Sequence, residues 1–394
     1  MSEPLTPQHS SLESYDFTNT SCPTHVIHKR IKSSLQYLFC GDALSMPVHW
    51  FYRQSDILKY FPPAGITRME AAPANHPGAI MNLHSVQRGG RRSHKDGTSN
   101  GNAVVGNVIL KDKARVWTTE GAHYHHGMPA GENTLNAWVA RELLNYLSKE
   151  GGYSDSNWLK HYINFMTAEP PRHPDSYAES YHREFFANLT DGKPLEDCGG
   201  ITHDTPSMGA LVTVPPLAMA LLADNPVASV QKICRRHVNY THPDKGLLAV
   251  VDAYVLLLSN LIYRPEDTDG DSYVQNAIKA SAPTVVSPAI DKLLQTNTQD
   301  NYVVGRLFSS ACYISDSWPS VCYLACKYGH DPDMALLRNT NLGGENAHRG
   351  AVLGSIAGLI GQHSPNNLYS QLKAGADLSV DIDNWLDRFY SAET

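Results

Sequence analysis

Three polar clusters stand directly before apolar segments of the chain, at residues 41–49, 131–134 and 343–349. Taken singly, each cluster is explained by helix capping, because Asp, Asn, Ser and Thr accept hydrogen bonds from the free N–H groups of a helix start. The second and third clusters, however, both read Gly-Glu-Asn, and capping needs only one such group per helix. Carboxylate and amide oxygens are hard ligands suited to Mg²⁺ or Ca²⁺. We therefore expect Glu132, Asn133, Glu345 and Asn346 to converge in one cleft, although more than 200 residues separate the two pairs.

Histidines accompany two of these clusters. His123, His125 and His126 precede Glu132, and His348 lies three residues after Glu345. Imidazole acts as a general acid or base near neutral pH, or as a ligand for softer metals such as Zn²⁺. A further polar group, His173-Pro174-Asp175 with His182-Arg183, precedes an expected helix over 183–189. That group could reach the pocket, but a solvated helix start is the preferred interpretation.

The elements that must position these clusters are helices. Apolar residues recur at helical spacing over eight segments: 26–40, 135–147, 214–223, 226–238, 246–262, 303–313, 318–328 and one that begins near Ala347. In the last segment Gly350, Gly354 and Gly358 lie four residues apart. Glycine weakens a helix by about 1 kcal/mol relative to alanine, so three on one face indicate a backbone packed closely against a neighbour. With no alternating strand pattern, the predicted fold class is all-α.

The expected organisation is one helical domain over residues 27–390. Residues 1–26 are rich in Ser, Thr and Pro and are predicted to form a flexible tail. They lack the basic region and the apolar region of a signal peptide, so a signal peptide is not expected. Between about 62 and 130 the helical pattern stops, and Gly, His, Pro and Arg become frequent. This stretch is expected to be a long loop insertion.

Composition narrows the classes of function. The chain has 394 residues, of which 42% are hydrophobic and 18% charged, and its net charge of −7 gives no reason to expect a nucleic-acid partner. No apolar run in the sequence is judged long enough to cross a membrane. Seven cysteines without a secretory signal indicate reduced thiols and a cytoplasmic location. Cys322 and Cys326 are one helical turn apart, but no second Cys/His pair accompanies them, so they are interpreted as core residues.

The order of the motifs resembles that of the ADP-ribosylglycohydrolase family, which includes the J1 crystallins. Residues 41–47 (Gly-Asp-Ala-Leu-Ser-Met-Pro) look like the first motif of the family, and Glu132-Asn133-Thr134 falls where it has Asp-Asp-Thr. The segment 342–350 falls where it has Gly-Gly-Asp-x-Asp-Thr before a helix of small residues. Between these motifs, Ser207-Met208-Gly209 with Pro216-Leu217-Ala218 is similar to a glycine-rich middle motif of the family. Thr241-His242 matches a Thr-His that follows two helices later. The resemblance runs from about residue 27 to 390 and implies a compact ADP-ribosylglycohydrolase-like multi-helix domain.

Departures from the family pattern concern its metal ligands. The paired aspartates that hold two magnesium ions become Glu132 and Asn133 here, and at the last motif Ala347 replaces an aspartate and His348 a threonine. His49 stands where many members carry glutamate, and Thr213 where they carry arginine. With less negative charge, two ions would repel each other more strongly, since two unit charges at 4 Å interact by about 4 kcal/mol at an effective dielectric of 20. The site is therefore expected to hold one divalent cation, Mg²⁺ or another, or none.

The resemblance implies a hydrolase that acts on an ADP-ribosyl or related N- or O-glycosidic bond of a small-molecule substrate. Two alternatives stay open: a fold recruited for another reaction of small-molecule metabolism, and a non-catalytic, crystallin-like protein. The expected residues fall into three groups. The catalytic group is Asp42, Glu132, Glu345 and His348; the substrate-binding group is His49, His125, Asn133, Ser207, Gly209, Asn346 and Arg349; the metal-binding group is Glu132, Thr134 and Glu345.

Overall fold

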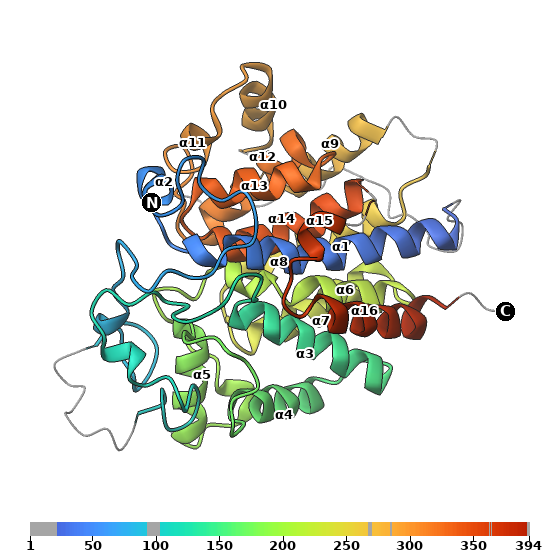
Figure 1. Ribbon diagram of the computed structural model, residues 1–394. Helices are drawn as coiled ribbons and strands as arrows, with labels where there is room; N and C mark the ends of the chain where they lie inside the picture. Colours follow the sequence, from blue (N-terminus) through green and yellow to red (C-terminus); the bar gives the residue numbers. More distant parts are fainter. Residues whose placement is uncertain are drawn as a thin grey trace, which may run out of the picture.

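Two long helices cross the centre of the molecule side by side. In the computed structural model, which describes residues 22–92, 103–266, 270–283, 286–361, 363 and 365–391, these are α1 (Thr24–Ser45) and α14 (Asn346–Gly361) (Figure 1). Their backbones touch where the glycines lie, since a Cβ added to Gly350 would stand 2.6 Å from the Gly41 carbonyl oxygen. At Gly358 it would stand 2.7 Å from the Ser33 carbonyl oxygen. Glycine is required here because any side chain would push the two helices apart.

The other helices pack around this pair, with one group on either side of it in Figure 1. On one side lie α9 (Gly270–Ser281), α10 (Ser287–Gln295), α11 (Asp300–Val303), α12 (Ile314–Tyr328) and α13 (Pro332–Leu342). On the other lie α3 (Leu135–Glu150), α4 (Asp155–Met166), α5 (Ser180–Thr190), α6 (Val214–Leu222), α7 (Val227–Asn239) and α16 (Gly375–Tyr390). The helices α2 (Gln54–Tyr60), α8 (Lys245–Ile262) and α15 (Asn366–Tyr369) complete the set. The described residues contain no strand beyond isolated bridges, so the all-α prediction is confirmed.

α8 is long and apolar enough, by length and composition, to cross a membrane, which the sequence analysis did not expect. Half of it is buried within the molecule. Its apolar residues belong to the main hydrophobic core, as they do in a core helix of a folded domain. Cys322 and Cys326 of α12 are likewise buried and unpaired, as the core interpretation requires.

Two predicted boundaries differ from the structure. The helix expected over 303–313 is absent: α11 ends at Val303, Gly305 has a φ of 128°, and the chain runs irregularly to α12 at Ile314. α1 begins at Thr24, three residues before the predicted start of the domain, while residues 1–21 of the expected tail lie outside the described residues. The long loop contains only short 3₁₀ turns over 61–92 and 103–132. The rest of that expected insertion, residues 93–102, lies outside the described residues.

Candidate active site

The start of α14 meets the chain that follows α1. Gly343 and Gly344 have φ values of 70° and 66°, which turn the chain sharply before Glu345. The Trp50 amide donates to the Gly344 carbonyl at 2.8 Å, and the Gly344 amide donates to the Phe51 carbonyl at 2.8 Å. This backbone pairing brings two segments that are almost 300 residues apart in sequence into register. Glu345 therefore lies beside His49 and Trp50.

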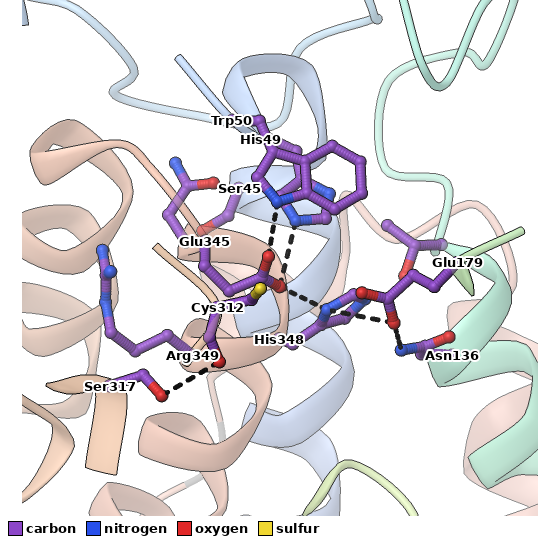
Figure 2. A network of polar contacts seen from close by, with 12 residues as sticks. Ser45, His49, Trp50, Asn136, Glu179, Cys312, Ser317, Glu345, His348 and Arg349 are labelled. Carbon is purple, nitrogen blue, oxygen red and sulfur yellow. Dashed lines mark hydrogen bonds and ion pairs between the residues drawn. The ribbon is translucent and has the colours of Figure 1, made fainter. Parts of the chain in front are cut away.

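Glu345, His49 and His348 form a fully buried cluster (Figure 2). Glu345 Oε1 lies 3.2 Å from His49 Nε2 and contacts His348 Nδ1, and the ligand-type atoms of the three residues all lie within 4.8 Å of one another. The other oxygen of Glu345, Oε2, accepts a hydrogen bond from the Trp50 indole N–H at 2.5 Å. The Trp50 ring also stacks on His49, with centroids 3.7 Å apart. Trp50 has a φ of 63°, which is rare for a bulky residue and often marks a functional site.

A second buried pair supports His49 from behind. His49 Nδ1 lies 2.8 Å from His125 Nε2, and His125 Nδ1 lies 2.8 Å from Asp175 Oδ1. Asp175 also accepts the backbone N–H groups of Leu135 at 2.7 Å and Tyr177 at 3.1 Å. Burial raises the pKa of Asp175, but the neighbouring His125 and these hydrogen bonds outweigh it, so the pKa is lowered overall. The chain Asp175–His125–His49 thus fixes the orientation of the His49 ring toward Glu345.

Glu179 faces the cluster from the start of α5. Its Oε2 lies 3.9 Å from His348 Nδ1 and accepts a hydrogen bond from Asn136 Nδ2 of α3 at 2.8 Å (Figure 2). Gly209 closes the space behind it, since a Cβ there would stand 2.7 Å from Asn136 Nδ2. Burial raises the pKa of Glu179 to about 7, although the charge of His348 opposes this. A carboxyl group of this kind can exchange a proton near neutral pH.

The charges of the cluster are coupled. Burial lowers the pKa of His348, but the carboxylates of Glu345, Glu179 and Asp42 outweigh it and raise the pKa to about 9. Burial likewise raises the pKa of Glu345, but the charge of His348, with a smaller effect of the neighbouring His49, holds it well below its ordinary value. In contrast, burial dominates at His49 and lowers its pKa to about 3. A positive centre at His348 is therefore surrounded by three carboxyl groups.

Asp42 joins the first and second polar motifs. Its Oδ2 accepts from Asn133 Nδ2 and from the Thr134 amide, both at 2.8 Å, and its Oδ1 accepts from the Thr134 hydroxyl at 2.6 Å. Burial raises the pKa of Asp42, against these hydrogen bonds and the charge of His348. Asn133 and Thr134 thus act as donors to Asp42.

Other residues expected at the site have their side chains engaged elsewhere. Glu132 Oε1 accepts a hydrogen bond from the Trp138 indole N–H at 3.2 Å. Burial raises the pKa of Glu132, and the charge of Lys373 opposes this. Glu345 is not among its described partners. Asn346 donates to the Thr340 carbonyl at 2.8 Å. Arg349 donates to Asn339 Oδ1 at 2.7 Å and to the Gly343 carbonyl at 2.8 Å, which holds the turn before Glu345. The Ser207 hydroxyl is buried and makes no hydrogen bond.

Almost the whole chain matches a model of one protein family. The model of the family described as ADP-ribosylglycohydrolase covers residues 23–393. The chain belongs to the ADP-ribosylglycohydrolase family. A solved structure described as an "ADP-ribosylglycohydrolase-related protein complex" is similar in fold, with a TM-score of 0.53 and 14% identity over 93% of this chain and 100% of that chain. No curated protein matches the sequence.

The two-magnesium site that this family membership suggests does not fit the residues present. Magnesium prefers an octahedron of oxygen ligands, but the converging donors here include two imidazole nitrogens. Asn133 turns its amide N–H group toward Asp42, so it stands as a hydrogen-bond donor to that carboxylate. Ala347 offers no ligand, and Glu132 is held by Trp138.

Four residues of this candidate site were not expected from the sequence: Trp50, Asn136, Asp175 and Glu179. Asp175 belongs to the polar group that was interpreted as solvated, and this interpretation was wrong, because Asp175, His182 and Arg183 are all buried. Asp175 lies near the end of the polar stretch before α5, and its side chain caps the amide of Leu135 across the molecule. The frequency of His and Asp in that stretch was the available signal.

Proposed function

We propose that this ADP-ribosylglycohydrolase-family protein hydrolyses an ADP-ribosyl or related N- or O-glycosidic bond of a small molecule, with one metal ion or none in place of two. The observation that supports the proposal is the buried cluster of Glu345, His348 and Glu179, in which two carboxylates face one imidazole. Burying three ionisable groups costs free energy unless they are paired. A cluster of this kind is typical of functional sites rather than of structural bulk.

Glu179 is the group we assign to proton transfer. Its Oε2 is held by Asn136, and the carboxyl group lies at the edge of the cluster. In the proposed reaction the oxygen of water bonds to the anomeric carbon, the C–N or C–O bond breaks, and a proton of water reaches the leaving atom by way of Glu179. The polar cluster around Glu345 would orient the sugar hydroxyl groups. Glu179 thus takes the role that the sequence suggested for Glu132, whose carboxylate accepts a hydrogen bond from Trp138.

Turnover of N- and O-linked ADP-ribosyl model compounds tests this assignment. Glu179→Gln should lower turnover by about 10²–10⁴-fold, the usual contribution of a general acid or base, while ADP-ribose still raises the melting temperature. Glu184→Gln is the matched control on the same helix, since Glu184 pairs with the partly exposed Arg88 instead of the cluster. Full turnover in Glu179→Gln would overturn the role of Glu179.

A thermal-shift screen separates the ADP-ribosyl proposal from its alternatives. A ligand that binds only the folded state stabilises it by RT ln(1 + [L]/Kd), so ADP-ribose at 100 times its Kd should add about 2.7 kcal/mol. If ADP-ribose and other nucleotides leave the melting temperature unchanged, the ADP-ribosyl substrate is wrong. A fold recruited for another small molecule then becomes the better interpretation.

A further inference from the structure

The hydrogen bonds around His49 dictate where its ring protons lie. Asp175 already accepts two backbone N–H groups, so the His125 Nδ1 that faces it is the donor. If both imidazoles are neutral, each carries one ring proton, so His125 Nε2 accepts and His49 Nδ1 donates to it. This uses the one ring proton of neutral His49. Its Nε2 therefore points a lone pair at Glu345 Oε1, 3.2 Å away.

Two acceptors that face each other in a dry interior repel unless a cation lies between them. The same oxygen of Glu345 is also contacted by His348 Nδ1, a buried atom that makes no hydrogen bond of acceptable geometry. The other oxygen is occupied by the Trp50 indole N–H. Three ligand-type atoms, Glu345 Oε1, His49 Nε2 and His348 Nδ1, thus lie within 4.8 Å of one another, around a position that either a proton of His348 or a metal ion can occupy (Figure 2).

We propose that these three atoms bind a single divalent transition-metal ion, of the class of Zn²⁺ or Co²⁺, in place of the magnesium pair of the family. Imidazole nitrogens with one carboxylate oxygen suit such ions, whereas Mg²⁺ and Ca²⁺ select oxygen ligands. Bonds of about 2.0–2.1 Å in a tetrahedron place neighbouring ligands about 3.3 Å apart. The 3.2 Å between His49 Nε2 and Glu345 Oε1 is close to that edge, whereas His348 Nδ1 lies nearer to Glu345 Oε1 than a tetrahedron allows, so the His348 ring would have to turn when the ion binds.

The surroundings of the three ligands are those of a metal site. A metal-bound histidine normally donates its second ring N–H to a carboxylate, a backbone carbonyl or water, and here His125, itself held by Asp175, would take that place for His49. Three protein ligands leave coordination positions open, as in catalytic rather than structural zinc sites. The inference deepens the proposed function and rests on it for its catalytic meaning, but metal binding can be measured without any substrate.

The test uses the full chain after removal of metal by a chelator, with zinc and cobalt alone as probes. Calorimetric titration should show one Zn²⁺ per chain with a dissociation constant in the micromolar range or below, unaffected by millimolar Mg²⁺. Cobalt should give the visible d–d absorption of a four- or five-coordinate nitrogen- and oxygen-ligated ion. His49→Ala and Glu345→Gln should each weaken zinc binding by at least about 100-fold, more than the 10–100-fold typical of outer partners.

His237→Ala is the matched control, because His237 is a buried histidine bonded to Tyr153 and Thr213 rather than to the cluster. It should bind zinc as the unaltered chain does, and circular dichroism should show all variants folded. The inference would be overturned if the folded chain bound no zinc, or if His49→Ala and Glu345→Gln bound zinc as tightly as the unaltered chain does. Absence of zinc binding would indicate that a proton, not a metal ion, lies between Glu345 and the two histidines. If the protein binds zinc but hydrolyses no ADP-ribosyl compound, the proposed function is wrong and the metal site stands. If it hydrolyses such a compound but binds no zinc, the metal site is wrong and the proposed function stands.

Discussion

Replacing Gly350 with alanine should separate the two central helices. The added Cβ would stand 2.6 Å from the Gly41 carbonyl oxygen and 2.9 Å from Asn339 Nδ2, whereas ordinary contact begins at 3.4 Å. The backbones must therefore move apart by roughly 0.8 Å, the difference between 3.4 and 2.6 Å. Overpacking of this kind costs about 1–3 kcal/mol, and alanine regains about 1 kcal/mol of helix propensity. We expect a net loss of about 0–2 kcal/mol in the free energy of unfolding.

Two further glycines make this a controlled measurement by urea denaturation. Gly358→Ala meets the same helix at 2.7 Å from Ser33, so it should cost a similar amount. Gly246 of α8 is exposed, and the atom nearest to an added Cβ is a side-chain oxygen at 3.3 Å. Gly246→Ala should therefore raise the free energy of unfolding by about 0.5–1 kcal/mol. Of Gly350 and Gly358, Gly350 is the one beside the cluster of Glu345, His49 and His348, since its partner Gly41 adjoins Asp42. Gly350→Ala should therefore also weaken zinc binding, and Gly358→Ala should not. A stabilised Gly350→Ala protein would refute the close packing.

Three other changes have defined outcomes. Asp300 accepts from Lys327 at 2.7 Å and from two tyrosines, so Asp300→Asn should lower the free energy of unfolding by about 1.5–3 kcal/mol at pH 7. Burial raises the pKa of Asp300, but these hydrogen bonds outweigh it and lower the pKa overall. The difference in free energy of unfolding between Asp300→Asn and the unaltered protein, measured in urea, should therefore be largest above about pH 4. It should vanish as the pH falls further and Asp300 becomes protonated. Gly209→Ala crowds the Glu179–Asn136 pair and should reduce turnover while zinc titration is unchanged. Trp50→Phe removes the N–H group on Glu345 and should weaken zinc binding by about 10–100-fold, whereas Trp138→Phe, which removes the N–H group on Glu132, should leave it unaltered.

The sequence was sufficient for the parts of the fold that follow from local pattern. The segments 135–147, 214–223, 226–238 and 246–262 are helices within one or two residues at most ends, because their apolar stripes face the core. The three glycines of α14 correctly indicated a close neighbour, and that neighbour is α1. Short helices with many polar residues, such as α2 and α10, were not expected, since tertiary packing rather than propensity stabilises them.

Side-chain direction at the site could not be predicted in the same way. Glu132 and Glu345 stand in identical Gly-Glu-Asn motifs, yet the first is held by a tryptophan of its own helix and the second by one from a distant loop. Glu179 and Asp175 reach the cluster through long-range contacts with α3, which no spacing in one sequence reveals. Which carboxylate faces the site is decided by its partners in space.

The substitutions at the family's metal positions form one consistent set when their hydrogen bonds are considered together. An acid-rich site needs ions to offset the repulsion between carboxylates. Here Asp42 is satisfied by Asn133 and Thr134, and Glu179 by Asn136, so neutral donors take over that role at two of the three acids. Glu345 differs: one oxygen is satisfied by Trp50, while the other faces two imidazoles. The cation at this one oxygen atom is the protonated His348 or, in our proposal, a metal ion, and the nitrogen ligands around the atom would favour a transition metal over magnesium.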